Sequence, residues 1–154
     1  MKDFFNNIVG IELFTTRACN MRCTYCYENK PKYSKFSKET ADNIVELIRT
    51  HPNIKYLDLF GGESLLPEIK GSLLDFLKNI ASVRTDFDMY ITTNALESEK
   101  VLDVIDYVAN TFDKVSLQIS LDGSKQAQDV CRVDNGRNGT FDRVFQNTIL
   151  LLDR

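Results

Sequence analysis

Three cysteines lie close together near the start of this chain, in the stretch ACNMRCTYCYENK. Cys19, Cys23 and Cys26 follow one another at spacings of four and three positions, whereas the fourth cysteine, Cys131, is remote in sequence. In a reducing compartment, thiols clustered in this way bind metals or carry out redox chemistry more often than they form disulfides. We therefore treat the cysteine loop, residues 17–26, as the first candidate site.

Three kinds of chemistry are compatible with this spacing. A structural zinc site needs four Cys or His ligands, and the further candidates, Cys131 and His51, are both distant in sequence. A thioredoxin-like dithiol would use Cys23 and Cys26 and would leave Cys19 without a role. Three thiolates on a short loop suit a cuboidal [4Fe–4S] cluster, because they anchor three irons and leave the fourth open for a substrate or cofactor. This third interpretation uses all the clustered cysteines.

The rest of the sequence alternates between the periodicities of strands and helices. Apolar residues recur at strand spacing in four segments, which predicts strands at residues 8–14, 54–60, 87–93 and 114–120. A helical pattern follows each strand, with N-cap residues predicted at Ser37, Ser72, Ser98 and Thr140. The residues predicted to form the packed faces of the four helices are Ala41, Ile44, Val45 and Ile48; Leu73, Phe76, Leu77 and Ile80; Val101, Leu102, Ile105 and Val108; and Phe141, Val144, Phe145, Thr148 and Leu152. Between residues 124 and 139 we expect a turn-rich loop.

This alternation predicts an α/β fold with a parallel sheet and right-handed crossovers. The carboxyl ends of parallel strands lie at one edge, where ligands bind in such folds. The segments expected there are residues 17–26, 61–63, 93–94 and 120–123, which contain the unusual polar residues of the chain. Four strands are too few to close a barrel, so the chain is expected to form only part of one.

Composition excludes several other classes of protein. The 154 residues are 43% hydrophobic, which fits a single domain with a real core. The net charge is −3 and the basic residues are interspersed with acids, so we expect no nucleic-acid partner. Asp3, Asn6 and Asn7 interrupt any secretory signal, and no segment approaches the ~20 apolar residues of a membrane span. We expect a cytoplasmic protein that does not enter the membrane.

The motifs at the strand ends resemble those of the radical S-adenosylmethionine (SAM) enzymes. Cys19, Cys23, Tyr25 and Cys26 form a CxxxCxYC motif that is similar to the signature of this superfamily. Gly61-Gly62-Glu63 resembles its GGE motif, and Thr93-Asn94 resembles its ribose-contacting segment. The three elements occur in the family's order along the chain.

A further set of residues resembles the sulfatase-maturating and peptide-modifying branch, whose members often add a cysteine-rich SPASM domain. This set comprises Ser120-Leu121-Asp122-Gly123, Asp129, Arg132 and Gly139-Thr140-Phe141. Gln128 and Ala95 depart from the family, which commonly has histidine and glycine there. The chain also has fewer βα units than the family core and no cysteines for auxiliary clusters. The resemblance implies that residues 1–154 are one domain, the N-terminal part of a truncated, partial TIM-like barrel of about four βα units without an auxiliary-cluster domain.

The resemblance also implies roles for individual residues. Cys19, Cys23 and Cys26 would bind three irons of a [4Fe–4S] cluster, and SAM would close the fourth iron through its amino and carboxylate groups. The residues expected to contact SAM are Gly61 and Gly62 by close backbone approach, Glu63 at the ammonium group, Ser120 and Arg132 at the carboxylate, Asn94 at the ribose and Tyr25 near the adenine. We expect Glu63 and Arg132 to be surface loop residues, whose substitution leaves thermal unfolding nearly unchanged. Asp122, Cys131 and His51 receive no role.

The function implied is reductive cleavage of SAM to a 5′-deoxyadenosyl radical that modifies a peptide or protein, with electrons from a reducing donor. One alternative is a non-catalytic module that binds the cluster and SAM as a partner subunit. The other is a zinc-bound structural domain. The last strand, residues 114–120, has no proline or crowded charge to protect an open edge, so we expect self-association, a docked partner or a further strand there.

Overall fold

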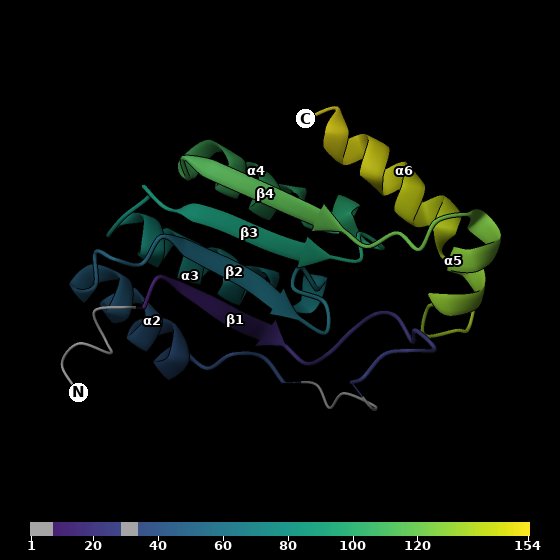
Figure 1. Cartoon of the computed structure of the whole chain (residues 1–154), viewed down its shortest axis with the longest axis horizontal. Helices are drawn as coiled ribbons and strands as arrows, with labels where there is room; N and C mark the ends of the chain where they lie inside the picture. Colours follow the sequence, from purple (N-terminus) through teal and green to yellow (C-terminus); the bar gives the residue numbers. More distant parts are fainter. Residues whose placement is uncertain (1–7, 29–33) are drawn as a thin grey trace.

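The computed structural model describes residues 8–28 and 34–154; residues 1–7, which include Asp3, Asn6 and Asn7, and residues 29–33 lie outside the described part. One sheet contains four parallel strands in the order β1-β2-β3-β4 (Figure 1). The strands are β1 (Gly10–Thr16), β2 (Tyr56–Gly61), β3 (Asp88–Thr93) and β4 (Lys114–Ile119). The predicted α/β fold with a parallel sheet is confirmed, and the carboxyl ends of all four strands point to the same edge.

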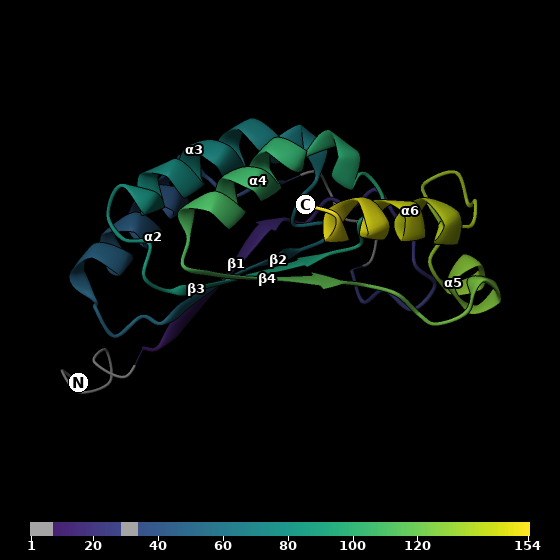
Figure 2. The ribbon, with the colours of Figure 1, turned by 90° about the horizontal axis from the view of Figure 1, so that it is seen from above.

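Helices occupy the connections between the strands and follow the last one. The α-helices are α2 (Lys38–Thr50), α3 (Lys70–Ala81), α4 (Leu102–Thr111), α5 (Lys125–Cys131) and α6 (Phe141–Leu152), and the short 3₁₀ helices are η1 (Pro67–Ile69) and η2 (Ser98–Lys100). Figure 2 shows α2, α3 and α4 on one face of the sheet, with α5 and α6 near the carboxyl ends of the strands. Among the described residues, no helix is both long and apolar enough to cross a membrane.

The main core lies between the sheet and α2, α3 and α4. Leu57 and Leu59 of β2 and Met89 of β3 are fully buried there. The helices contribute residues of their predicted apolar stripes, including Ala41, Ile44, Ile48, Leu73, Phe76, Leu77, Ile80 and Val108, together with Val104, which the sequence analysis did not include. Burial of each large apolar side chain stabilises the fold by about 1.5–3 kcal/mol. This layer is the rigid support from which the strand ends project.

A second, smaller apolar cluster lies beneath the cysteine loop. Met21, Ala95, Leu96 and Val144 are buried in it, and Cys19 and Cys23 pack against it with Ile119. Its residues come from the cysteine loop, the segment after β3 and α6. The cysteine loop therefore packs on an apolar cluster that is separate from the main core.

The helix caps follow the sequence only in part. Ser37 caps α2 as predicted, because its hydroxyl accepts a hydrogen bond of 3.0 Å from the amide of Thr40. The caps predicted at Ser72 and Ser98 are wrong. The 3₁₀ turn η1 leads directly into α3, so that helix begins at Lys70, before Ser72. Ser98 begins η2 instead, and α4 starts at Leu102.

The segment after β4 differs most from the prediction. The expected turn-rich loop contains α5, whose N-cap is Ser124. Thr140 precedes α6, but its hydroxyl donates to the carbonyl of Arg132 at 2.6 Å instead of capping the helix. Phe145 and Leu152 of α6 are exposed although their spacing predicted burial. In the described chain the sheet ends at β4, so these side chains meet no further strand.

Candidate functional site

The strand ends surround one cavity of about 200 Å³. Its lining includes every residue for which the sequence predicted a cofactor contact: Cys19, Cys23, Tyr25, Cys26, Gly61, Gly62, Glu63, Asn94, Ser120 and Arg132. These residues come from segments that are far apart in the chain, at the edge of the sheet to which the strand arrows point in Figure 1. The structure therefore brings the whole predicted set together.

The turn after β2 holds the first part of the cysteine loop. The amide of Gly62 donates to the carbonyl of Thr16 at 2.8 Å, and the amide of Glu63 donates to the carbonyl of Ala18 at 2.9 Å. A Cβ atom on Gly62 would lie 2.3 Å from the Ala18 oxygen, and Gly61 has a φ of 145°, which side chains rarely adopt. Glycine is needed here because β2 and the cysteine loop approach so closely.

The end of α5 and the segment after it hold the second part of the loop. The amide of Arg22 donates to the carbonyl of Val133 at 2.7 Å, and the amide of Thr24 donates to the carbonyl of Cys131 at 2.8 Å. Cys131 thus supports the loop through its backbone. The loop is fixed on both sides by backbone hydrogen bonds, which order the residues between the thiols.

The three clustered cysteines differ in their surroundings. Burial raises the pKa of Cys19 to about 11, although the amide of Met21 donates to its sulfur at 3.4 Å. Burial also raises the pKa of Cys23, and the positive charge of Arg132 opposes this shift. Cys26 is exposed, and all four cysteines are free thiols. A metal or cluster that binds here must displace protons from these thiols.

The thiols and the charged groups fit the expected cofactors. Three free cysteines that line one cavity supply soft sulfur ligands, which suit iron–sulfur clusters as well as zinc. Arg132 adds a cation suited to a carboxylate. Within the described residues, no three Cys, His, Asp or Glu side chains already stand in metal-binding geometry. The three clustered cysteines line the same cavity, but their side chains do not yet form a metal-binding group.

Glu63 is buried, so the expectation of a surface residue is wrong. Its side chain is only 3% exposed, and its carboxylate accepts hydrogen bonds from the Leu65 amide at 3.1 Å, the Thr93 hydroxyl at 2.5 Å and the Asn94 amide at 2.7 Å. Burial raises the pKa of Glu63, and these hydrogen bonds oppose the shift. The turn after Gly62 places Glu63 beneath the end of β3, so Glu63 joins these two strand ends.

Asn94 links β3 to the cysteine loop. Its amide nitrogen donates to the side chain of Asn20 at 2.9 Å and lies 3.6 Å from the sulfur of Cys19. Its side-chain oxygen accepts from the amide of Leu96 at 2.9 Å. Ala95 follows with a φ of 56°, a left-handed conformation that glycine adopts more readily than alanine. The predicted ribose contact of Asn94 stays a prediction.

Arg132 is mostly buried, so the surface position expected for it is also wrong. Its side chain is 17% exposed, and its Nε donates to Asp122 at 2.8 Å. Its guanidinium lies 5.5 Å from the centre of the Tyr25 ring. Partial desolvation would raise the pKa of Asp122, but hydrogen bonds from Tyr25 and Arg132 outweigh it and hold that pKa below its usual range. Ser120 is placed at the same edge by a 3.0 Å bond from its amide to the carbonyl of Thr93.

Two residues of the site were missed from the sequence. Asp122 received no role from the sequence, although an acid two residues after a predicted strand end is a signal for a site residue. Asn20 lies between two cysteines, and its amide donates to Glu97 at 2.9 Å. A larger hollow of about 700 Å³ lies elsewhere, between α2 and α3, and is lined by none of the residues predicted to contact a cofactor.

The sheet, the strand-end cavity and its three thiols define an α/β protein built to hold a cofactor at the carboxyl ends of its strands. Residues 13–154 match the family model of the Radical SAM superfamily, and the chain belongs to this superfamily. The two cofactors expected from the sequence, a [4Fe–4S] cluster and SAM, are those of this superfamily.

Individual relatives are similar along different lengths. A GTP 3′,8-cyclase from Alkaliphilus metalliredigens is 30% identical over 65% of this chain and 32% of its own length. The sporulation killing factor maturation protein SkfB from Bacillus subtilis is 29% identical over 92% of this chain and 32% of its own length. This chain thus spans about a third of the length of these relatives.

Solved structures show the same fold. Native anSMEcpe with bound AdoMet, which is SAM, matches with a TM-score of 0.75 at 18% identity, over 95% of this chain and 41% of that one. The same protein with bound AdoMet and Cp18Cys peptide matches with a TM-score of 0.70 at 19% identity, over 94% of this chain and 39% of that one. The chain therefore has the fold of about two fifths of the anSMEcpe chain.

Proposed function

We propose that this chain binds a [4Fe–4S] cluster through Cys19, Cys23 and Cys26, binds SAM beside it, and serves as the N-terminal part of a radical SAM enzyme. The observation that carries the proposal is that one cavity is lined by all the residues of the CxxxCxYC, GGE and Thr93-Asn94 motifs for which a role was predicted, together with Ser120 and Arg132. When bound, the cluster supplies the electron for reductive cleavage of SAM to a 5′-deoxyadenosyl radical.

In this proposal, different residues of the chain position the thiols and bind the parts of SAM. Gly61 and Gly62 let the backbone of β2 reach the cysteine loop, which sets the positions of the thiols. Glu63 fixes the ends of β2 and β3 against each other, and in this proposal its Oε2, which accepts one hydrogen bond from Asn94, accepts a second from the SAM ammonium group. Ser120 and Arg132 bind the SAM carboxylate in this proposal, with Asn94 at the ribose and Tyr25 beside the adenine.

A peptide or protein is the proposed substrate. SkfB, named as a maturation protein, matches nearly the whole chain, and the anSMEcpe structure with a bound peptide shares the fold. The GTP 3′,8-cyclases are the specific observation in favour of a second candidate, a nucleotide substrate. We also propose that a reducing donor supplies the electrons and that the protein is cytoplasmic. Neither nucleic acid nor a membrane is a proposed partner, and residues 1–154 are proposed to form one domain.

Anaerobic reconstitution followed by reduction in the presence of SAM tests the proposal. We expect 5′-deoxyadenosine, measured by chromatography, from the wild-type chain and none from Cys23→Ala. An intact cluster that yields no 5′-deoxyadenosine would favour a non-catalytic module instead. Bound zinc in place of iron would favour a structural domain. Stimulation of 5′-deoxyadenosine formation by GTP would favour the nucleotide substrate.

A further inference from the structure

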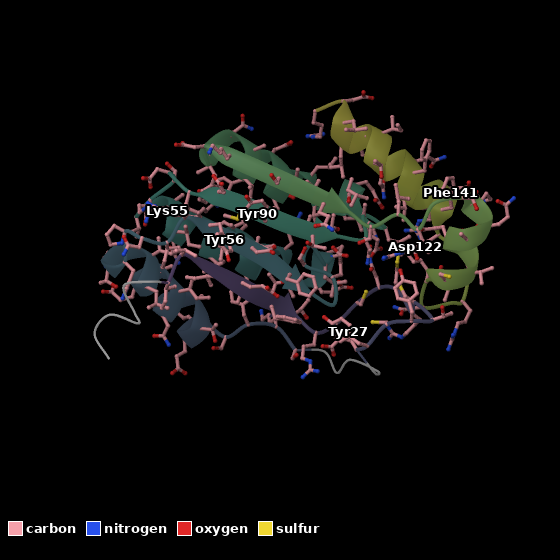
Figure 3. The ribbon with its side chains drawn as sticks, in the orientation of Figure 1. Tyr27, Lys55, Tyr56, Tyr90, Asp122 and Phe141 are labelled. Carbon is pink, nitrogen blue, oxygen red and sulfur yellow. The ribbon has the colours of Figure 1, made fainter. Side chains whose placement is uncertain are left out.

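Three side chains from different segments meet beside the cysteine loop. Tyr25 lies in that loop, Asp122 follows β4, and Arg132 follows α5. The Tyr25 hydroxyl donates to Oδ2 of Asp122 at 2.6 Å, while Nε of Arg132 donates to Oδ1 at 2.8 Å. Figure 3 shows Asp122 between the end of β4 and α5. Each carboxylate oxygen of Asp122 thus has its own donor, and the two donors belong to the two residues that also stack on each other.

A buried amide fixes the backbone of this group. The amide of Asp122 donates to Oε1 of Gln128 at 2.8 Å, and Gln128 is fully buried. Nε2 of Gln128 donates to the hydroxyl of Thr140 at 3.4 Å, and that hydroxyl donates to the carbonyl of Arg132. The same chain of hydrogen bonds therefore holds the backbones of Asp122 and Arg132 relative to each other, at positions from which their side chains meet.

This arrangement occupies only one side of the guanidinium. An arginine has five N–H donors in a planar fork, and Nε carries just one of them. Within residues 8–28 and 34–154, the two terminal nitrogens of Arg132 have no hydrogen-bond partner, and Arg132 lines the cavity. The donors that remain are those suited to two parallel hydrogen bonds with a carboxylate.

We propose that Asp122 is a positioning residue: it holds Arg132 so that its terminal N–H groups meet the carboxylate of an α-amino-acid ligand. Through its other carboxylate oxygen, Asp122 also links Arg132 to Tyr25 of the cysteine loop. The inference rests on the proposed function, in which that ligand is SAM. The inference predicts the direction in which the affinity for SAM changes when Asp122 is replaced. An Asp122 that merely competed with the ligand for Arg132 would weaken binding, so its removal would strengthen it; a positioning Asp122 has the opposite effect.

Calorimetric titration of the cluster-loaded protein with SAM measures that direction. We expect Asp122→Asn to weaken SAM binding about tenfold, the effect of one misplaced hydrogen bond to a charged group. Tyr25→Phe, which keeps the ring and removes only the hydroxyl, should weaken it less. The matched control is Asp106→Asn, because Asp106 pairs with Arg154 away from the cavity. The decarboxylated analogue of SAM should bind wild type and Asp122→Asn equally. Unchanged or tighter SAM binding by Asp122→Asn overturns the inference.

Nuclear magnetic resonance of the protein without cofactors gives a second readout. We expect slow solvent exchange of the Arg132 Nε–H proton in the wild type and in Asp106→Asn, and at least tenfold faster exchange in Asp122→Asn. Equal exchange in all three proteins contradicts the positioning role even if Asp122→Asn binds SAM poorly. A wild-type protein that binds no SAM contradicts the proposed function and the ligand assigned here, whereas normal wild-type binding unaffected by Asp122→Asn contradicts this inference alone.

Discussion

Glu63 illustrates how a motif residue can serve the fold and the site together. Three donors meet its carboxylate, and a glutamine offers a single acceptor oxygen and would turn an N–H group toward one of them. We expect Glu63→Gln to lower the free energy of unfolding by about 1–3 kcal/mol because it leaves a buried donor unpaired. The melting temperature should fall by about 2–4 °C per kcal/mol.

Thermal unfolding followed by circular dichroism measures this change. Glu68→Gln is a suitable control because Glu68 is exposed on the nearby helix η1. Equal melting temperatures for the two variants would show that the buried hydrogen bonds of Glu63 contribute nothing to stability.

Cys19 gives a prediction that depends on pH. The thiolate is the reactive form, and the pKa of Cys19 is raised to about 11 by burial, so almost all of this thiol is protonated near pH 8. Alkylation of Cys19 by iodoacetamide should therefore be slower than that of exposed Cys26, and should accelerate about tenfold per pH unit up to its pKa. Peptide mapping by mass spectrometry follows both sites.

The control for this experiment is the urea-unfolded chain, in which burial no longer distinguishes the two thiols. If Cys19 and Cys26 react at the same rate in the folded chain at pH 7.5, the surroundings assigned to Cys19 are wrong.

The spacing of the cysteines, the GGE sequence and the family resemblance of the later strand ends predicted residues that the structure brings to one cavity. Their environments were not predictable from the sequence. Glu63 becomes buried because Thr93 and Asn94 reach it from another strand, and Asp122 meets Tyr25 because the segment after β4 lies beside the cysteine loop. Such contacts depend on tertiary packing, which local patterns do not encode.

The turn after β2 and the cysteine loop depend on each other as two elements in contact. A methyl group on Gly62 would lie 2.3 Å from the carbonyl oxygen of Ala18, so the backbone before Cys19 must shift. We expect Gly62→Ala to reduce the cluster content after reconstitution by at least half. Gly71→Ala is the control, because a Cβ there meets nothing within 4 Å.

The charge-transfer absorbance of the reconstituted proteins measures cluster content. A Gly62→Ala protein that takes up as much cluster as Gly71→Ala would mean that the contact between the turn and the loop does not set the position of the thiols.

The elements themselves were predictable where hydrophobic periodicity was strong. The stripes of α2 and α3 and all four strands were found within about two residues, which is the usual precision for element ends. The helix starts were less predictable, because 3₁₀ turns precede α3 and α4 and displace the serine caps. Helix α5 was missed because its short sequence, KQAQDVC, lacks an apolar stripe.

Strand β4 leaves one edge of the sheet open in the described chain. It pairs only with β3, and its sequence has no proline and a single charge, Lys114. An unprotected edge is a template for pairing with another strand. We expect the isolated chain to self-associate or to dock a further strand or partner there, as measured by size-exclusion chromatography with light scattering.

Hydrogen exchange over residues 114–120 provides the matching local measurement. The amides that face away from β3 should exchange rapidly in dilute solution and become protected as the chain associates. A monomer at all concentrations, with protection along both sides of β4, would contradict this account of the edge.

The overall architecture followed from the alternation of strands and helices, because parallel strands joined by helices have few stable arrangements. The exposure of two apolar side chains of α6 did not follow from this alternation. Phe145 and Leu152 have the spacing of core residues, yet their burial depends on a neighbouring strand that the described residues do not supply. The periodicity of a helix predicts which face is apolar, and the surrounding sheet determines whether that face is covered.

The central claim is that Cys19, Cys23 and Cys26 together hold a [4Fe–4S] cluster in the strand-end cavity. Iron and sulfide analysis of the anaerobically reconstituted chain and its four single Cys→Ala variants tests it most directly. We predict about four irons and four sulfides per chain for the wild type and for Cys131→Ala, and loss of the cluster in each of the other three variants. Zinc without sulfide in the wild type, or a Cys131→Ala protein that loses its cluster, would contradict the claim.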